Sequence, residues 1–203
     1  MADILIDNQT ASSTPAAGKS VLQVDSTTKK FYQMDDSGIP HGILSSNIAT
    51  SAQGAIATTE VYLTNSGLQV PSYGMKVGMT FVWYISAVKT GAGTAAPVWT
   101  FRIGNAQTTS DTSRLALTST GAQVATAMDG TLIATLRVRS VGASGVVDGN
   151  GGAGPANFGG GGSGASSSFD NTSTIAGQYV GLTVTTGASA AWTINGLSAY
   201  LFG

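Results

Sequence analysis

Residues 79–88 read MTFVWYISAV, with bulky apolar side chains at every second position. Successive side chains of a β-strand point to opposite faces. The stretch therefore predicts a strand with two different faces, one formed by Phe81, Trp83 and Ile85 and the other by Val82, Tyr84 and Ser86. The same period of two appears in 98–103 (VWTFRI) and 132–139 (LIATLRVR). These three stretches predict a chain built from strands.

Weaker strand patterns surround these three, at 60–64, 115–117, 179–185 and 191–202. Turns rich in Gly and Asn separate them, and no ten-residue stretch keeps the 3.6-residue period of a helix. We therefore predict an all-β fold for residues 58–203: a jelly-roll-like β-sandwich.

The composition is poor in charge, with 9% Asp, Glu, Lys and Arg against about 25% in typical soluble domains. The net charge of −1 provides no electrostatic footprint for nucleic acid or anionic lipid. A surface of small uncharged residues suits contact between subunits, so we expect a homotrimer; a soluble monomer with a neutral polar surface is the alternative. The chain has no cysteine, which excludes disulfides and thiolate metal sites.

The chain contains no apolar run of about 18 residues, so we expect no membrane span. Its first residues, MADILID, lack the basic and apolar regions of a signal peptide. We expect a protein that is made and retained in a cytoplasm, or is released only by lysis.

The N-terminal quarter contains two small units. Residues 1–18 form an arm with an apolar tip, Ile4, Leu5 and Ile6, which we expect to add a strand to a partner's sheet. Residues 19–44 form a β-hairpin module, because two alternating runs flank a short polar loop. We expect residues 45–57 to be a linker and residues 58–203 to fold without 1–44. The candidate anchoring residues of the module are Val21, Leu22, Val24, Phe31, Tyr32 and Met34.

Residues 142–168 contain eleven glycines and interrupt the strand pattern. Ordering such a chain costs about 1–2 kcal/mol per residue in backbone entropy, so we expect a long flexible loop between two strands. An alternative is an exposed loop that adapts to a partner, with Phe158 and Phe169 as its contacts.

Candidate chemistry is sparse. The single histidine, His41, follows Pro40 in a turn and lacks the sequence context of a catalytic base. Nearly all of the ten acidic residues fall in predicted turns, where a carboxylate caps its own backbone. We therefore expect no catalytic residues, no cofactor and no metal; a cellular enzyme remains the distant alternative.

Two segments resemble those of tailed-bacteriophage virion surface proteins. Residues 15–38, PAAGKSVLQVDSTTKKFYQMDDSG, are similar to a hairpin module near the N-termini of phage fibre and decoration proteins. Residues 89–115, KTGAGTAAPVWTFRIGNAQTTSDTSRL, are similar to a feature of β-sandwich head-fibre, decoration and tail-fibre proteins. Together the two segments cover about a quarter of the chain.

The resemblance implies a structural protein on the virion surface, assembled in the host cytoplasm. It would decorate or project from the head and be held by its N-terminal region on the major capsid protein or another virion protein. The alternative is a tail-fibre or baseplate adhesin that binds a host surface glycan, for which an aromatic shelf near 142–168 would be expected. The Gly-rich stretch departs from the family pattern.

Overall fold

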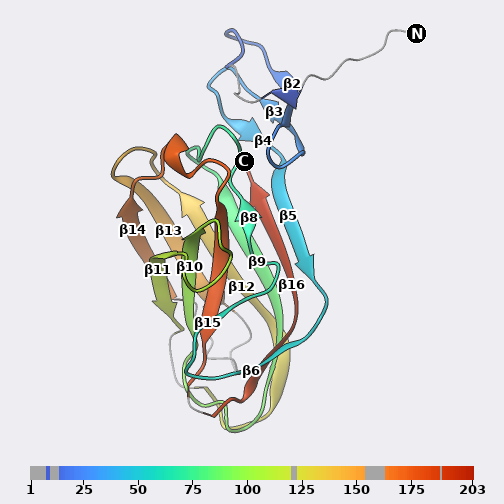
Figure 1. Ribbon diagram of the computed structural model, residues 1–203, viewed down its shortest axis with the longest axis vertical. Helices are drawn as coiled ribbons and strands as arrows, with labels where there is room; N and C mark the ends of the chain where they lie inside the picture. Colours follow the sequence, from blue (N-terminus) through green and yellow to red (C-terminus); the bar gives the residue numbers. More distant parts are fainter. Residues whose placement is uncertain (1–7, 10–13, 120–122, 154–162, 188) are drawn as a thin grey trace, which may run out of the picture.

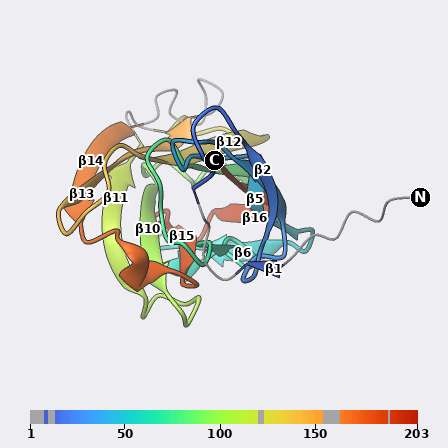
Figure 2. The same ribbon diagram turned by 90° about the horizontal axis from the view of Figure 1, so that it is seen from above.

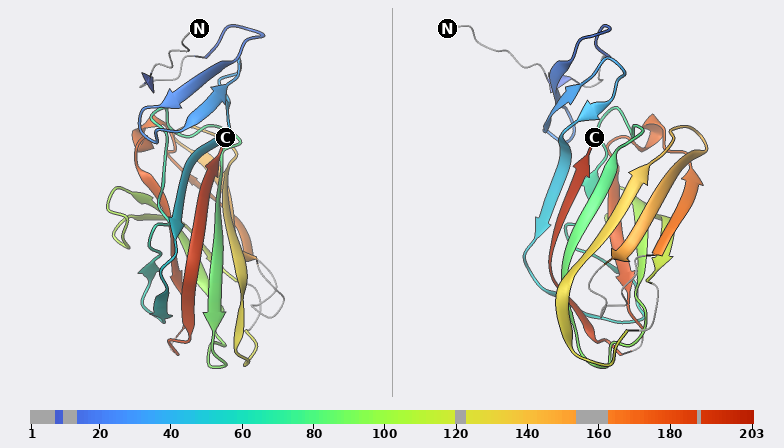
Figure 3. Two further views of the ribbon diagram at one scale, coloured as in Figure 1. Left: turned by 90° about the vertical axis from the view of Figure 1, so that its right-hand side faces the viewer. Right: turned by 180° about the vertical axis from the view of Figure 1, so that it is seen from behind.

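The computed structural model describes residues 8–9, 14–119, 123–153, 163–187 and 189–203. Within these residues the chain forms β-strands and one short 3₁₀ turn, Ser173–Ile175. The strands make two packed sheets, with a small third sheet at one end of the long axis (Figures 1 and 3). The predicted all-β sandwich is confirmed.

The two large sheets have seven and five strands. The seven-stranded sheet contains β5 (Ile43–Ala49), β6 (Gln53–Ile56), β9 (Thr80–Lys89), β12 (Met128–Val138), β13 (Gly145–Ala153), β14 (Ser163–Phe169) and β16 (Trp192–Phe202). The five-stranded sheet contains β7 (Val61–Tyr62), β8 (Leu68–Gln69), β10 (Val98–Gly104), β11 (Thr112–Thr118) and β15 (Tyr179–Thr185). Seen from above, they form two curved layers (Figure 2).

The strand order is that of a jelly roll. Eight principal strands, in chain order, are β5, β7, β9, β10, β11, β12, β15 and β16. One sheet contains β5-β16-β9-β12, and the other contains β7-β15-β10-β11. The first strand thus pairs with the eighth, and the second with the seventh, which is the double Greek key of this fold. The hairpin β13–β14 extends the first sheet beyond β12.

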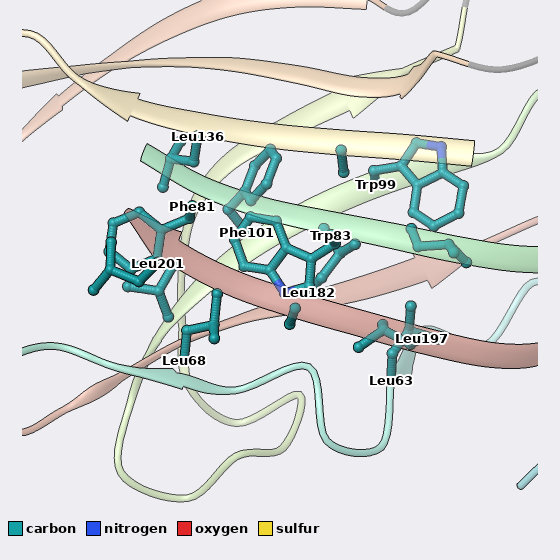
Figure 4. Packing of buried hydrophobic residues seen from close by; sticks show 14 of the residues in the cluster. Leu63, Leu68, Phe81, Trp83, Trp99, Phe101, Leu136, Leu182, Leu197 and Leu201 are labelled. Atoms are coloured by element: carbon teal, nitrogen blue, oxygen red, sulfur yellow. The ribbon is translucent and has the colours of Figure 1, made fainter. Parts of the chain in front are cut away.

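The core lies between the two sheets, and the face predicted for Phe81, Trp83 and Ile85 is the one turned into it. Trp83 of β9 and Phe101 of β10 meet across the sandwich, with ring centroids 5.4 Å apart (Figure 4). Both side chains are fully buried, as are Leu136, Leu182 and Leu201 around them. The Trp83 indole Nε1 donates a hydrogen bond to the Ser66 carbonyl at 2.8 Å, so its one polar atom is satisfied in the core.

The Gly-rich stretch is not one long loop, so that prediction was wrong. Residues 145–153 and 163–169 form β13 and β14, which pair antiparallel from Gly145–Phe169 to Gly151–Ser163. Gly149 and Gly151 face the other sheet: a Cβ at Gly149 would lie 2.5 Å from Leu115 Cδ2, and one at Gly151 3.1 Å from Leu117 Cβ. Glycine is therefore used here for close approach between the sheets.

The predicted linker at 45–57 also proves to be part of the sandwich. Strand β5 begins at Ile43 and pairs with β16 through residue 49, and β6 pairs with the other end of β16. Leu44 at the start of β5 is fully buried. The first strand of the jelly roll thus starts inside the segment that the sequence assigned to the N-terminal module.

The small third sheet is the N-terminal module. It contains β1 (Asn8–Gln9), β2 (Val21–Asp25), β3 (Phe31–Met34) and β4 (Pro40–His41). The predicted hairpin is confirmed as β2–β3, closed by the turn at 25–29. Residues 8–9 of the arm pair parallel with β2 of the same chain. The arm's tip at 4–6, for which the sequence predicts pairing with a partner, lies outside the described residues.

Candidate attachment surface

The N-terminal module is held on the end of the sandwich by a buried carboxylate. Asp25, 1% exposed, accepts hydrogen bonds from the Ser72 amide at 3.0 Å and the Ser72 hydroxyl at 2.8 Å. Its other oxygen accepts from the amides of Thr27 and Thr28 in the hairpin turn. One side chain therefore closes the turn and fixes the hairpin to a loop 47 residues away.

An aromatic contact beside Asp25 fixes the same face of the hairpin. The ring of Tyr32 packs 5.5 Å from that of Tyr73 in the sandwich, and its hydroxyl donates to Gln23 Oε1 at 2.7 Å. Burial, and secondarily the nearby Asp25 carboxylate, raises the pKa of Tyr32 to about 12. Tyr32 therefore keeps its proton, and this hydrogen bond, at neutral pH.

The module residues predicted to anchor the chain divide between the two faces of this hairpin. Tyr32 and Met34 point inward and belong to the core, so their assignment to an external anchor was wrong. Leu22 and Phe31 point outward and are each 58% exposed. The partly exposed Val24 lies between them in the register, directly across from Phe31, and Val21 is 42% exposed at the start of β2. We call Leu22, Val24 and Phe31 the outer hairpin face.

The other predicted contact residues do not add to this surface. Ile4, Leu5, Ile6 and Phe158 lie outside the described residues. Phe169 is buried at the end of β14, beneath the guanidinium of Arg114, whose central carbon is 4.9 Å from the ring centroid. Its prediction as an exposed loop contact was wrong, because β14 carries it into the sandwich.

The sequence reasoning missed three exposed apolar residues at this end of the molecule. Ile39 of the module and Val77 and Val141 of the sandwich are all more than a third exposed, and they line one hollow of about 470 Å³. Tyr73 and Met75 line it from the sandwich. The three come from separate segments, so no local sequence pattern could have brought them together.

The only histidine lies on β4, and its side chain contacts the turn before that strand. His41 Nε2 lies 3.0 Å from Asp35 Oδ2, while Asp35 Oδ1 accepts hydrogen bonds from the amides of Ser37 and Ile39. The hydrogen bond with His41, followed by that from Ile39, holds the pKa of Asp35 below its usual value. These contacts close the loop between β3 and β4, which is the structural role expected for a turn histidine.

An ion pair with two hydrogen bonds lies on the outer side of the five-stranded sheet. Arg102 of β10 donates from Nε and Nη2 to the two carboxylate oxygens of Glu60, at 2.9 and 2.6 Å. The Thr183 hydroxyl of β15 donates to the same carboxylate. The Arg102 hydrogen bonds hold the pKa of Glu60 below its usual value, against an opposing effect of burial. The pair joins the start of β7 to two neighbouring strands.

We expect this pair to make stability depend on pH in the acid range. A carboxylate with a lowered folded-state pKa stabilises the fold above its unfolded value, about 4.5, and this contribution is lost as the pH falls through the lowered pKa. Urea unfolding of the wild type and of Glu60→Gln should therefore differ most near neutral pH and converge in acid. A constant difference across the acid range would contradict this assignment.

No three His, Cys, Asp or Glu side chains are grouped as a metal site in the part of the chain that the structure describes. In the same residues, no helix is long and apolar enough to cross a membrane.

No protein-family model and no curated protein matches the sequence. Among solved structures, a similar one is lectin I from Ulex europaeus, in complex with the methyl glycoside of α-L-fucose. The two share 8% identity over 77% of this chain and 92% of the lectin, with a TM-score of 0.30. At that identity and TM-score, the similarity is no guide to what this chain binds.

Proposed function

We propose that this chain is a non-enzymatic structural protein of a tailed-phage virion, attached to the particle surface by its N-terminal module and displaying the jelly roll outward. The observation that carries the proposal is the outer hairpin face: Leu22 and Phe31 are uncovered, yet the hairpin that bears them is held on the sandwich through Asp25 and Tyr32. Its sequence is also the one that resembles the attachment modules of phage fibre and decoration proteins.

Burial of this face would supply a usable tether. Fully burying one large apolar side chain stabilises a complex by about 1.5–3 kcal/mol, and the hairpin presents two that are more than half exposed. Because Asp25 and Tyr32 already order the hairpin, little conformational entropy is lost when it docks. The hollow lined by Ile39, Val77 and Val141 lies at the same end and extends the apolar surface that a capsid protein could cover.

The adhesin alternative has less support. It predicts an aromatic shelf beside the Gly-rich stretch, but Phe169 is buried there and Phe158 lies outside the described residues.

We expect Leu22→Ser/Phe31→Ser to weaken attachment at least about tenfold. The double variant loses the burial of two large apolar side chains, which is more than the roughly 1.4 kcal/mol that corresponds to a tenfold change in affinity. The measurement is occupancy by electron microscopy, after adding purified protein to phage particles that lack it. The control is Val124→Ser, an exposed apolar residue in another part of the sandwich.

Wild-type occupancy by the double variant would place the anchor elsewhere, and a protein that is absent from purified particles would refute the virion assignment. Point substitutions are the sharper test, because deletion of residues 1–44 would remove Tyr32, Met34 and Leu44 from the core. The expectation that 58–203 folds without that segment stays a prediction, so the deletion would not separate loss of attachment from loss of core packing.

A further inference from the structure

The outer face of the seven-stranded sheet is apolar at its centre. These outward side chains include Tyr84, which is 43% exposed, and Ile48, which is 55% exposed. The ring of Tyr200 lies 6.3 Å from that of Tyr84 and 6.0 Å from that of Phe202, which makes an aromatic cluster across β9 and β16. The outer side of the five-stranded sheet differs, because it carries the Arg102–Glu60 ion pair.

The strand register arranges these residues in rows across the sheet. A central row contains Ile133, Tyr84, Ser198 and Ile48, from β12, β9, β16 and β5. The next row, towards the C-terminal ends of β12 and β16, contains Thr135, Val82, Tyr200 and Ser46. The row on the opposite side contains Thr131, Ser86 and Gly196. One side of the central row is therefore bulky, and the other is small.

The small side is also hollow. A depression of about 430 Å³ is lined by Ser86, Thr131 and Gly196, with Tyr84 and Ile48 at the central row. Tyr200 is on the bulky side, one row from the centre, and Gly196 is one row from the centre on the other side. The face therefore carries a large, partly exposed aromatic side chain and a hollow at equal separations from the central row.

Charges on this face follow the same symmetry. Asp129 and Arg137 both lie on β12, four residues before and four residues after Ile133, so all three side chains point outward. At about 3.4 Å per residue, the two charged positions are about 27 Å apart. Among the residues that the structure describes, neither Asp129 nor Arg137 forms an ion pair.

We propose that two copies of this chain pair face to face through this sheet, about a two-fold axis that lies in the interface along the central row. Such an axis reverses the strand direction and keeps the order of the strands, so that β12 packs over β12 of the second copy. Arg137 of each copy then faces Asp129 of the other, and Tyr200 of each copy enters the hollow above Gly196 of the other. Facing sheets within about 30° of parallel are a common packing.

The occupant is a second copy because the face complements itself. In a two-fold interface, if one residue contacts another across the axis, the reverse contact also occurs. The Tyr200 side chain and the hollow at Gly196 satisfy this condition, and so do the two opposite charges. The proposal replaces the homotrimer expected from the low surface charge, and it does not depend on attachment to a virion.

The test is the mass of the full chain in solution, measured by sedimentation velocity with light scattering. We expect twice the chain mass of 20.3 kDa at micromolar concentration. Tyr200→Ala should raise the dimer dissociation constant at least about thirtyfold, because each dimer loses two buried aromatic anchors. Thr118→Arg, an exposed change on the other sheet, should leave the constant unchanged.

A charge exchange tests the axis itself. Asp129→Arg should weaken the dimer by placing two arginines together at both ends, and Asp129→Arg/Arg137→Asp should restore it by exchanging the partners. A wild-type monomer or trimer would overturn the proposal, as would a double exchange that stays as weak as the single one. Circular dichroism of each variant separates loss of the dimer from loss of the fold.

Discussion

Trp83→Ala should lower the free energy of unfolding by about 3–5 kcal/mol, the cost of truncating a buried aromatic side chain. Trp83 is fully buried between the sheets, stacked on Phe81 with a centroid distance of 6.2 Å and tilted against Phe101. Neighbours in two different sheets would have to move to fill the cavity, and the jelly-roll pairing of β9 with β12 and β16 resists that movement.

The indole also satisfies a buried carbonyl, which adds to the cost. Trp83 donates to the carbonyl of Ser66, and Ser66 is itself fully buried, with its hydroxyl donating to the Leu182 carbonyl and accepting from the Leu182 amide. Losing the indole leaves the Ser66 carbonyl without that donor in the core, a penalty of about 1–3 kcal/mol.

Urea unfolding of wild type, Trp83→Ala and Trp83→Phe at one protein concentration measures both effects. Trp83→Phe keeps an aromatic ring in place but removes the donor, so it should fall between the other two. A loss below about 1 kcal/mol for Trp83→Ala would mean that the core refills the site, contrary to the packing described above.

The strands that sequence predicted correctly have one face against the core and one against solvent. In β9 and β12 this condition produces clean alternation, so Phe81, Trp83, Leu132 and Leu136 could be assigned inward from the sequence alone. Alternating strands do not by themselves specify a strand order. The jelly roll could be predicted because few sandwich topologies are available to a chain of such strands.

The strands that sequence missed are made of small residues whose conformation depends on distant partners. In β5, Ser45, Ser46 and Asn47 interrupt the apolar pattern, and pairing with β16 at the far end of the chain makes the segment a strand. The sequence of β13 and β14, rich in glycine and serine, looks like that of a flexible loop. Glycine in β13 instead allows close approach to β11, and this contact cannot be read locally because β11 belongs to the other sheet.

For the attachment surface, the sequence predicts the two faces of the hairpin but not which of them is covered, because the covering residues are distant in the sequence. Alternation puts Leu22 and Phe31 on the face opposite Tyr32 and Met34, but it does not say which face is covered, so all four are predicted from the sequence to belong to the anchor. The answer depends on Ser72 and Tyr73 in a remote loop, which bind the face that carries the polar residues Gln23 and Asp25. The more apolar-looking Leu22 and Phe31 are thereby left outside.

Gly149→Val should destabilise the protein by about 1–3 kcal/mol, although valine is otherwise a strong strand former. Even the first carbon of a side chain at this position would lie 2.5 Å from Leu115 Cδ2 and 3.1 Å from Phe101 Cε2. Leu115 is buried and Phe101 is fully enclosed in the core, so β13 would have to move away from the sandwich. The cost arises from overpacking between sheets.

The control lies on the other strand of the same hairpin. Gly164 is exposed on β14, and a Cβ there would meet only the Gly149 carbonyl oxygen, at an ordinary 3.8 Å. Gly164→Val should therefore change the free energy of unfolding by no more than about 0.5 kcal/mol. The measurement is urea unfolding of both variants, with amide exchange of β13 and β14 to locate the change. Equal effects of the two substitutions would mean that glycine serves flexibility along the whole hairpin. A large effect at Gly149 alone would mean that it serves contact with Leu115 and Phe101.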